Sequence, residues 1–144
     1  MSDVRSRYEA CAGPNPIAPD FLRKLERELG VSLPASFLAA AGYFDGRGIV
    51  ALPLHPMADI PANVLDETLR LRRAINLPNR FIVLGEPPES LLVLDCIDGT
   101  VIWCDATDAT GLGEGRFSQK PHVWTQFSDF LEFLLDEQDA EGPA

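Results

Sequence analysis

Residues 91–105 read LLVLDCIDGTVIWCD, and two apolar runs in this stretch flank Asp98-Gly99. Asp-Gly supplies the positive φ angles that a two-residue type I′ turn needs, so the stretch predicts a β-hairpin. Ile97 then lies opposite Thr100, which fixes the register of the flanking strands. The predicted cross-strand partners are Cys96 with Val101, Asp95 with Ile102, Leu94 with Trp103, Val93 with Cys104, and Leu92 with Asp105.

This register divides the hairpin between two faces of a sheet, because successive residues of a strand point to opposite sides. The first face is apolar and is expected to meet a helix. It holds Leu92, Leu94, Cys96, Val101 and Trp103. The second face is also apolar but carries Asp95 in the middle of its strand. We expect the second face to be half open and to offer a candidate binding surface.

The segments around the hairpin predict several helices. Apolar residues recur at helical spacing in the closing stretch, at Phe127, Phe130, Leu131, Leu134 and Leu135. Three earlier helices are predicted at 19–29, at 34–41, and from Asp59 or Pro61 to the residues before Pro78. The third of these would present Asp66 and Arg70 as an exposed i,i+4 pair.

Further strands are predicted on both sides of the hairpin. Residues 80–85 read as a strand, and the link from Glu86 to Glu89 is short enough to make three consecutive antiparallel strands. A short strand is expected at 49–52 and an edge strand within 116–124, where Pro121 interrupts it. The glycine-rich residues 106–115 are expected to form a mobile loop. In this reading, residues 1–18 are an N-terminal arm, 19–136 a single domain, and 137–144 a frayed acidic tail. Residues 1–12 are expected to be either a short arm or a loosely packed helix.

The acidic charge of the chain is unevenly distributed. Of 22 acids and twelve bases, residues 1–83 hold nine and ten, whereas residues 84–144 hold thirteen and two, a net charge of −11. Nucleic acid is therefore excluded as a favoured partner, because phosphate contacts need clustered Lys and Arg. A basic protein surface fits better, although excess acid by itself also keeps a protein soluble.

The cysteines and the apolar runs indicate the expected location. The three cysteines are few and odd in number, and Cys96 and Cys104 point to opposite faces of the hairpin, so no bridge between them is expected. Met1 is not followed by the basic and apolar segments of a secretion signal. No apolar run approaches the roughly 20 residues of a membrane span. We therefore expect a cytoplasmic protein with reduced thiols and no membrane association.

No constellation for catalysis stands out in the sequence. Neither His55 nor His122 has a Cys or a carboxylate at the sequence spacing that is typical of metal ligands. No metal or cofactor is therefore expected. The glycines at 111–115 lack the Lys and the helix that a phosphate loop requires. Asp95 and Asp105 fall on opposite faces in the predicted register and cannot act together as acid and base. We expect the protein not to be an enzyme.

The order of these segments resembles the SUKH superfamily, the Smi/Knr-like, Syd-like and related proteins. The resemblance runs from Pro19 to Leu135 and rests on four stretches: LERELGVSLPASFL, FIVLGE, LLVLDCIDGTVIWCD and TQFSDFLEFLL. The chain departs from the family at Ala41-Gly42-Tyr43, where an Asn-Gly-Gly-like turn is usual. The resemblance implies a SUKH-like single α+β domain with a curved antiparallel sheet flanked by helices. It also implies binding of protein partners, because bacterial members are most often immunity proteins that block a secreted toxin, whereas fungal members include regulators of cell-wall synthesis.

Charge and resemblance together favour a cytoplasmic immunity protein that covers a basic toxin of the nuclease or deaminase class. The candidate contacts are acids of the second half with two aromatic anchors: Glu86, Glu89, Asp95, Asp105, Asp108, Glu114, Tyr43 and Phe44. Each of these residues taken singly is also explained as a solvated surface residue. The alternative is an intracellular scaffold or regulator of the Smi/Knr-like kind on the same fold.

Overall fold

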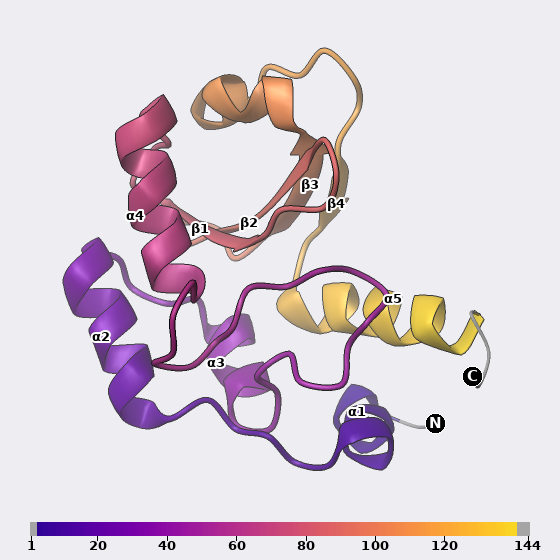
Figure 1. Cartoon of the computed structure of the whole chain (residues 1–144). Coiled ribbons are helices and arrows are strands. Elements are labelled where there is room, and N and C mark those ends of the chain that lie inside the picture. Colours follow the sequence, from indigo (N-terminus) through magenta and orange to yellow (C-terminus); the bar gives the residue numbers. More distant parts are fainter. Residues whose placement is uncertain (1–2, 141–144) are drawn as a thin grey trace.

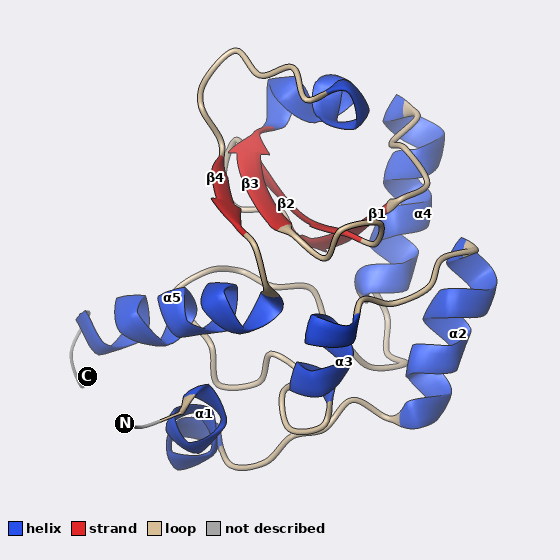
Figure 2. Cartoon of the chain, turned by 180° about the vertical axis from the view of Figure 1, so that it is seen from behind, coloured by secondary structure: helices blue, strands red, loops and turns tan. Residues whose placement is uncertain are grey.

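Four antiparallel strands form one sheet in the computed structural model, which describes residues 3–140 (Figures 1 and 2). The strands lie side by side in chain order: β1 Phe81–Gly85, β2 Ser90–Asp95, β3 Val101–Asp105 and β4 His122–Trp124. The helices are α1 Val4–Ala12, α2 Pro19–Leu29, α3 Ala35–Ala41, α4 Val64–Ile75, the 3₁₀ helix η1 Ala106–Glu114, and α5 Phe127–Ala140. The predicted α+β class is confirmed.

The hairpin forms, but its register differs by two residues from the predicted one. Leu94 pairs with Val101, and the Asp95 N–H donates to the Thr100 carbonyl at 2.8 Å, so the turn contains the four residues 96–99 rather than two. Asp95 explains the longer turn. Its carboxylate is buried and accepts a hydrogen bond from the backbone N–H of Ile97 at 2.9 Å, a partner that a two-residue turn would not offer. Because the shift is an even number of residues, every strand side chain keeps its predicted face.

The first face of the sheet meets a helix, as predicted. Leu92, Leu94 and Val101 are fully buried in the main core, which α5 joins through Phe130 and Leu134. The Trp124 and Phe130 rings lie 5.0 Å apart in an edge-to-face arrangement that aromatic pairs prefer. Figure 2 shows α3 and α5 on this side of the sheet. The closing helix is therefore central to the fold.

The second face is covered, so the predicted half-open sheet surface is wrong. A second cluster of buried side chains lies on it, with Val83, Val93 and Ile102 from the strands. Leu71 of α4 and Leu112 of η1 cover these side chains. Residues 106–115 are accordingly a short helix and not the predicted mobile loop. Asp105 starts this helix by accepting a hydrogen bond from the Thr107 N–H at 2.8 Å.

The N-terminal residues also contact the main core. Tyr8 of α1 is fully buried, and its hydroxyl donates to the Arg47 carbonyl at 2.7 Å. Arg7 forms an ion pair with Asp136 of α5, so α1 and α5 lie close together (Figure 1). The predicted arm is thus packed structure in its described part. The predicted tail begins inside α5, and residues 141–144 lie outside the described residues.

The structure between residue 49 and α4 differs from the predicted one in two details. Residues 49–52 form no strand, and the N–H of Val50 donates to the Gln138 side chain at 2.8 Å instead of to a neighbouring strand. Helix α4 begins at Val64, where Asn63 and Asp66 form a capping box. Asp66 is thereby occupied, and Arg70 pairs with Glu67 rather than with Asp66. No helix within residues 3–140 has the length and apolar composition that a membrane crossing requires.

The three cysteines should differ in reactivity. All three are free, Cys11 is exposed, and burial raises the pKa of Cys96 to about 12 and that of Cys104 to about 11. Because the thiolate is the reactive form, we expect one thiol, Cys11, to react with Ellman's reagent at neutral pH, and all three in denaturant. A Cys11→Ser variant should lack the rapid phase of the reaction with Ellman's reagent that the exposed thiol causes. A rapid phase that persists in this variant would contradict the burial of Cys96 and Cys104.

Candidate protein-binding surface

Three of the predicted acidic contacts gather at one end of the sheet. The link between β1 and β2 carries Glu86 and Glu89, and Ser90, which follows, pairs with Asp105 at the end of β3. The Glu89 carbonyl accepts a hydrogen bond from the Ala106 N–H at 3.0 Å, which ties this link to the start of η1. We call Glu86, Glu89 and Asp105 the acidic rim.

Glu89 and Asp105 form no ion pair with a base within residues 3–140, so both carry uncompensated charge. Glu89 is exposed and has a left-handed backbone with φ of 61°, a conformation that few residues other than Gly adopt. The hydroxyl and N–H of Thr107 donate to Asp105 and hold the pKa of that carboxyl below its usual value. Asp105 therefore stays ionised in mildly acidic solution.

Two predicted acidic contacts are buried and cannot belong to an exposed surface. Asp95 is only 3% exposed and forms an ion pair with Arg80, whose Nε lies 2.9 Å from the carboxylate. Asp108 is 7% exposed and accepts hydrogen bonds from the N–H and hydroxyl of Ser118, at 3.0 and 3.1 Å. Asp95 stabilises the hairpin turn, and Asp108 ties η1 to the loop that follows it, because a buried carboxylate needs hydrogen-bond donors.

The two predicted aromatic anchors are also core residues. Phe44 is fully buried, with its ring 4.9 Å from that of Tyr8 and 5.8 Å from that of Phe127. Tyr43 is 9% exposed, and the Arg5 guanidinium lies over its ring at 5.5 Å. The turn after α3 points its aromatics inward because α1 supplies a partner for them. The last predicted acid, Glu114, is exposed and forms an ion pair with Arg116.

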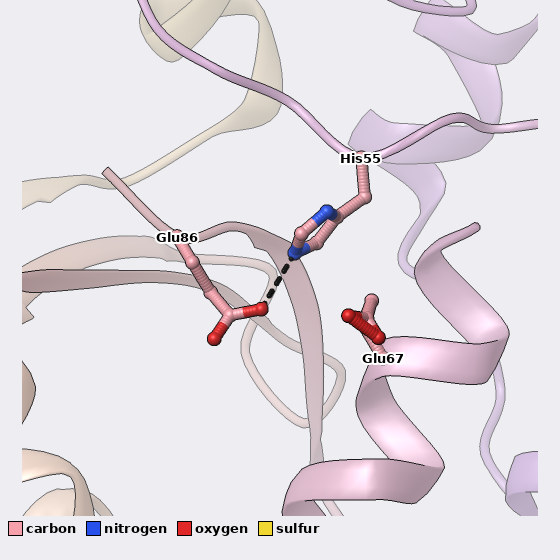
Figure 3. Close-up of side chains that lie close together, drawn as sticks. All are labelled: His55, Glu67 and Glu86. Carbon is pink, nitrogen blue, oxygen red and sulfur yellow. Dashed lines mark hydrogen bonds and ion pairs between the residues drawn. The ribbon is translucent and has the colours of Figure 1, made fainter. Parts of the chain in front are cut away.

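Beside the acidic rim lies a cluster of charged side chains that the sequence interpretation missed. Figure 3 shows His55, Glu67 and Glu86 facing one another from three separate segments. His55 Nε2 lies 2.9 Å from Glu86 Oε2, and Arg70 bonds Glu86 at 2.6 Å and Glu67 at 3.2 Å. The pairing of Glu67 with Arg70 could be predicted from the sequence, because residues three apart on a helix are neighbours. The meeting of His55 with Glu86 depends on the path of the proline-bounded segment, which no local pattern determines.

The cluster fixes the ionisation of Glu86. Burial alone would raise the pKa of its carboxyl, but the hydrogen bonds from Arg70 and His55 outweigh burial and leave that pKa below its usual value. His55 also donates its backbone N–H to the Leu84 carbonyl at 2.8 Å, which covers the free edge of β1. Glu86 is thus an ionised carboxylate held in one place between α4 and the sheet.

The same three side chains have the composition of a divalent-metal site. One ligand atom of each lies within 4.8 Å of the others, and imidazole with carboxylate is a common donor set for zinc. The Arg70 guanidinium, however, already bonds both carboxylates and supplies the positive charge that a metal would bring. The arrangement fits an ion-pair cluster better than a metal centre.

A pH measurement should detect the cluster. Because the folded-state pKa of Glu86 is lowered, its ionised form adds stability above the unfolded-state pKa, near 4.5, and this stability disappears as the pH falls through the folded value. Glu86→Gln should therefore flatten the loss of unfolding free energy between about pH 5 and pH 3. The measurement is urea unfolding across this range, with Glu137→Gln at an exposed position of α5 as the control. Parallel curves for wild type and Glu86→Gln would refute the cluster.

A small pocket opens next to Glu86, between α4 and η1. Its volume is about 180 Å³. Its lining consists of Leu71, Ile75, Glu86, Ser90, Leu91, Ala106 and Ala109. Leu71, Leu91 and Ala109 belong to the second core cluster, so the bottom of the pocket is apolar. The acidic rim therefore borders an apolar hollow, because Glu86 lines it and Glu89 and Asp105 directly precede the lining residues Ser90 and Ala106. An apolar centre beside polar residues is typical of protein-binding surfaces.

Comparison with protein families places this chain. A model of the SMI1 / KNR4 family (SUKH-1) matches residues 16–132. The match covers all four strands, η1, α2, α3 and α4, and the first turns of α5. It confirms the resemblance that the sequence suggested. No curated protein matches the chain.

Proposed function

Since the chain belongs to the SMI1 / KNR4 family (SUKH-1), we propose that it is a non-enzymatic binding protein, an immunity protein that neutralises a basic toxin domain. The observation that supports this proposal most is the acidic rim around the apolar pocket. Two of its three carboxylates have no counter-charge within residues 3–140. A partner with Lys or Arg at the matching positions would supply the missing charge.

The class of toxin follows from the charge of the surface. Nucleases and deaminases act on nucleic acid and need positive surfaces to hold phosphates. An inhibitor with an anionic surface gains faster encounter and better complementarity against such partners. The net charge of −11 over residues 84–144 supplies the long-range attraction, and the rim supplies local contacts.

The non-enzymatic part of the proposal rests on the chemistry of the described side chains. Cys96 and Cys104 stay protonated at neutral pH because burial raises both pKa values, so they are poor nucleophiles. The buried carboxylates Asp95 and Asp108 are engaged in turns. Glu86 is ionised and paired with Arg70, which makes it a poor proton donor.

The test begins with the genes beside the one that encodes this chain. We expect a toxin gene to lie directly next to it, and expression of that toxin domain to stop cell growth. Co-expression of this chain should restore growth, and the purified chain should inhibit the toxin at an equimolar ratio. A catalytically inactive toxin should form a stable complex at physiological salt. The absence of a toxin gene, or a toxin that stays active in excess chain, would contradict the proposal and favour an intracellular scaffold or Smi/Knr-like regulator.

A further inference from the structure

The pocket between α4 and η1 has the size of a site for one side chain. Its volume of about 180 Å³ lies well below the roughly 300–1,000 Å³ of pockets that enclose whole small molecules. Binding hot spots are typically single anchors that fill pockets of a protein surface. The volume therefore favours a protein side chain over a metabolite.

The walls of the pocket come from two elements that each pack on the sheet. Helix α4 lies along β1 and contributes Leu71 and Ile75, whereas η1 lies on β2 and β3 and contributes Ala106 and Ala109. Small alanines on the η1 side leave the space that a larger side chain would fill. Two elements anchored on one sheet hold the pocket open without a partner, so a guest side chain would enter a preformed site.

The chemistry of the side chain that the pocket accepts follows from the floor of the pocket and from the acidic rim. Leu71 and Leu91 are 8% and 3% exposed and give the floor an aliphatic surface. Glu86 lines the pocket but is already paired with Arg70 and His55. Glu89 and Asp105 directly precede the lining residues Ser90 and Ala106 in the chain, and neither forms an ion pair with a base within residues 3–140. The complement is an aliphatic side chain between two basic residues.

We propose that this pocket receives a leucine-sized apolar side chain from a basic segment of the partner, with neighbouring Lys or Arg residues placed against Glu89 and Asp105. This inference rests on the proposed function, because it specifies the partner surface that the acidic rim recognises. The apolar anchor supplies the area that is removed from water, and the flanking charges set the orientation of the segment.

Short peptides test the proposal without knowledge of the partner. The probe is the capped tripeptide acetyl-Arg-Leu-Lys-amide, titrated into isotope-labelled protein and followed by two-dimensional NMR. We expect saturable shifts at the amides of Ile75, Leu91, Ala106 and Ala109, with an affinity in the millimolar range. Replacing Leu by Ala in the peptide should weaken binding about tenfold or more, because the buried aliphatic surface is lost. The acidic peptide acetyl-Glu-Leu-Glu-amide should bind at least several-fold more weakly.

Two substitutions on η1 provide a matched pair. Ala106→Phe adds a ring at the pocket, whereas Thr110→Phe adds the same ring at an exposed position that does not line it. Both positions are exposed, so both variants should melt within a few degrees of wild type. Peptide shifts should vanish in Ala106→Phe and persist in Thr110→Phe. Glu89→Lys should weaken binding of the basic peptide several-fold and reduce its salt dependence.

Three outcomes would overturn the inference. The first is that the basic peptide causes no shifts around the pocket, and the second is that Ala106→Phe and Thr110→Phe bind it equally well. The third is equal binding of the acidic peptide, which would mean that the pocket takes apolar groups without regard to charge. None of these depends on a toxin gene. Failure of the pocket is thereby distinguishable from failure of the immunity function, which the growth assay tests separately.

Discussion

Phe130→Ala is expected to lower the free energy of unfolding by about 3–5 kcal/mol, the usual cost of removing a buried ring from a core. Phe130 is fully buried on α5 and contacts two aromatic rings, with centroids 5.0 Å away at Trp124 and 5.7 Å away at Phe127. These neighbours come from β4 and from the start of the helix, so the cavity would lie where α5 meets the sheet. The measurement is denaturant unfolding monitored by circular dichroism.

Phe133→Ala on the same helix is the matched control. Its ring is only partly buried and packs 4.9 Å from that of Trp124, near the surface. The same truncation there should cost clearly less, because solvent already reaches the ring and little cavity forms. Equal losses of unfolding free energy in the two variants would mean that α5 is peripheral to the core. The same would follow if Phe130→Ala shifted the denaturant midpoint by less than about a tenth of the wild-type value.

Arg80→Met is expected to cost about 3 kcal/mol, because it leaves the Asp95 carboxylate buried without its counter-charge. Asp95 has a side chain only 4% exposed, and Arg80 bonds both of its carboxylate oxygens. The expected cost is at the lower end of the range for buried pairs, since Arg80 itself is 31% exposed. Equilibrium unfolding in urea provides the measurement.

Arg70→Met offers the corresponding control for that substitution. Arg70 pairs with Glu67 and Glu86, whose side chains are 19% and 31% exposed, and is itself 45% exposed. Exposed pairs contribute at most about 1 kcal/mol, so the cost should be clearly smaller there. If Arg80→Met is no more destabilising than Arg70→Met, the hairpin turn does not depend on the Arg80–Asp95 pair.

The parts of the fold that could be predicted are those with strong local periodicity. The spacing of Phe127, Phe130 and Leu134 predicts α5, and the apolar runs on both sides of Asp98-Gly99 predict the hairpin. The turn residues alone favoured the shorter loop, because the requirement of Asp95 for donors depends on its burial. Burial in turn depends on the pairing of β1 with β2, which brings Arg80 beside Asp95 and which no local pattern shows.

The same limit applies to the candidate site. Glu86, Glu89 and Asp105 could be predicted as neighbours, because a hairpin register brings the ends of adjacent strands together. The inward position of Phe44 could not, since it depends on α1 packing against it from a distant part of the sequence. The sequence of η1 does contain a pattern typical of a 3₁₀ helix, because the apolar residues Ala109 and Leu112 are three apart. The glycines among them obscured it.

The role of the acidic rim in binding is tested most directly by the rate of association with the toxin domain that the proposed function expects. The rim variant, Glu89→Lys with Asp105→Asn, changes the net charge by +3, and Asn retains the ability to cap η1. Glu132→Lys with Glu137→Gln makes the same change at exposed positions of α5, on the other side of the sheet (Figure 1). Both double variants should melt close to wild type, because they alter exposed or partly exposed side chains.

Stopped-flow association at two ionic strengths compares the three proteins. The rim variant should associate about tenfold or more slowly than wild type at low salt, with a flatter salt dependence, because charges that face the partner accelerate encounter. The α5 variant should lose much less, although its net charge is the same. Equal rates for the two variants would contradict the account, since net charge alone would then govern association and the acidic rim would not be the binding surface.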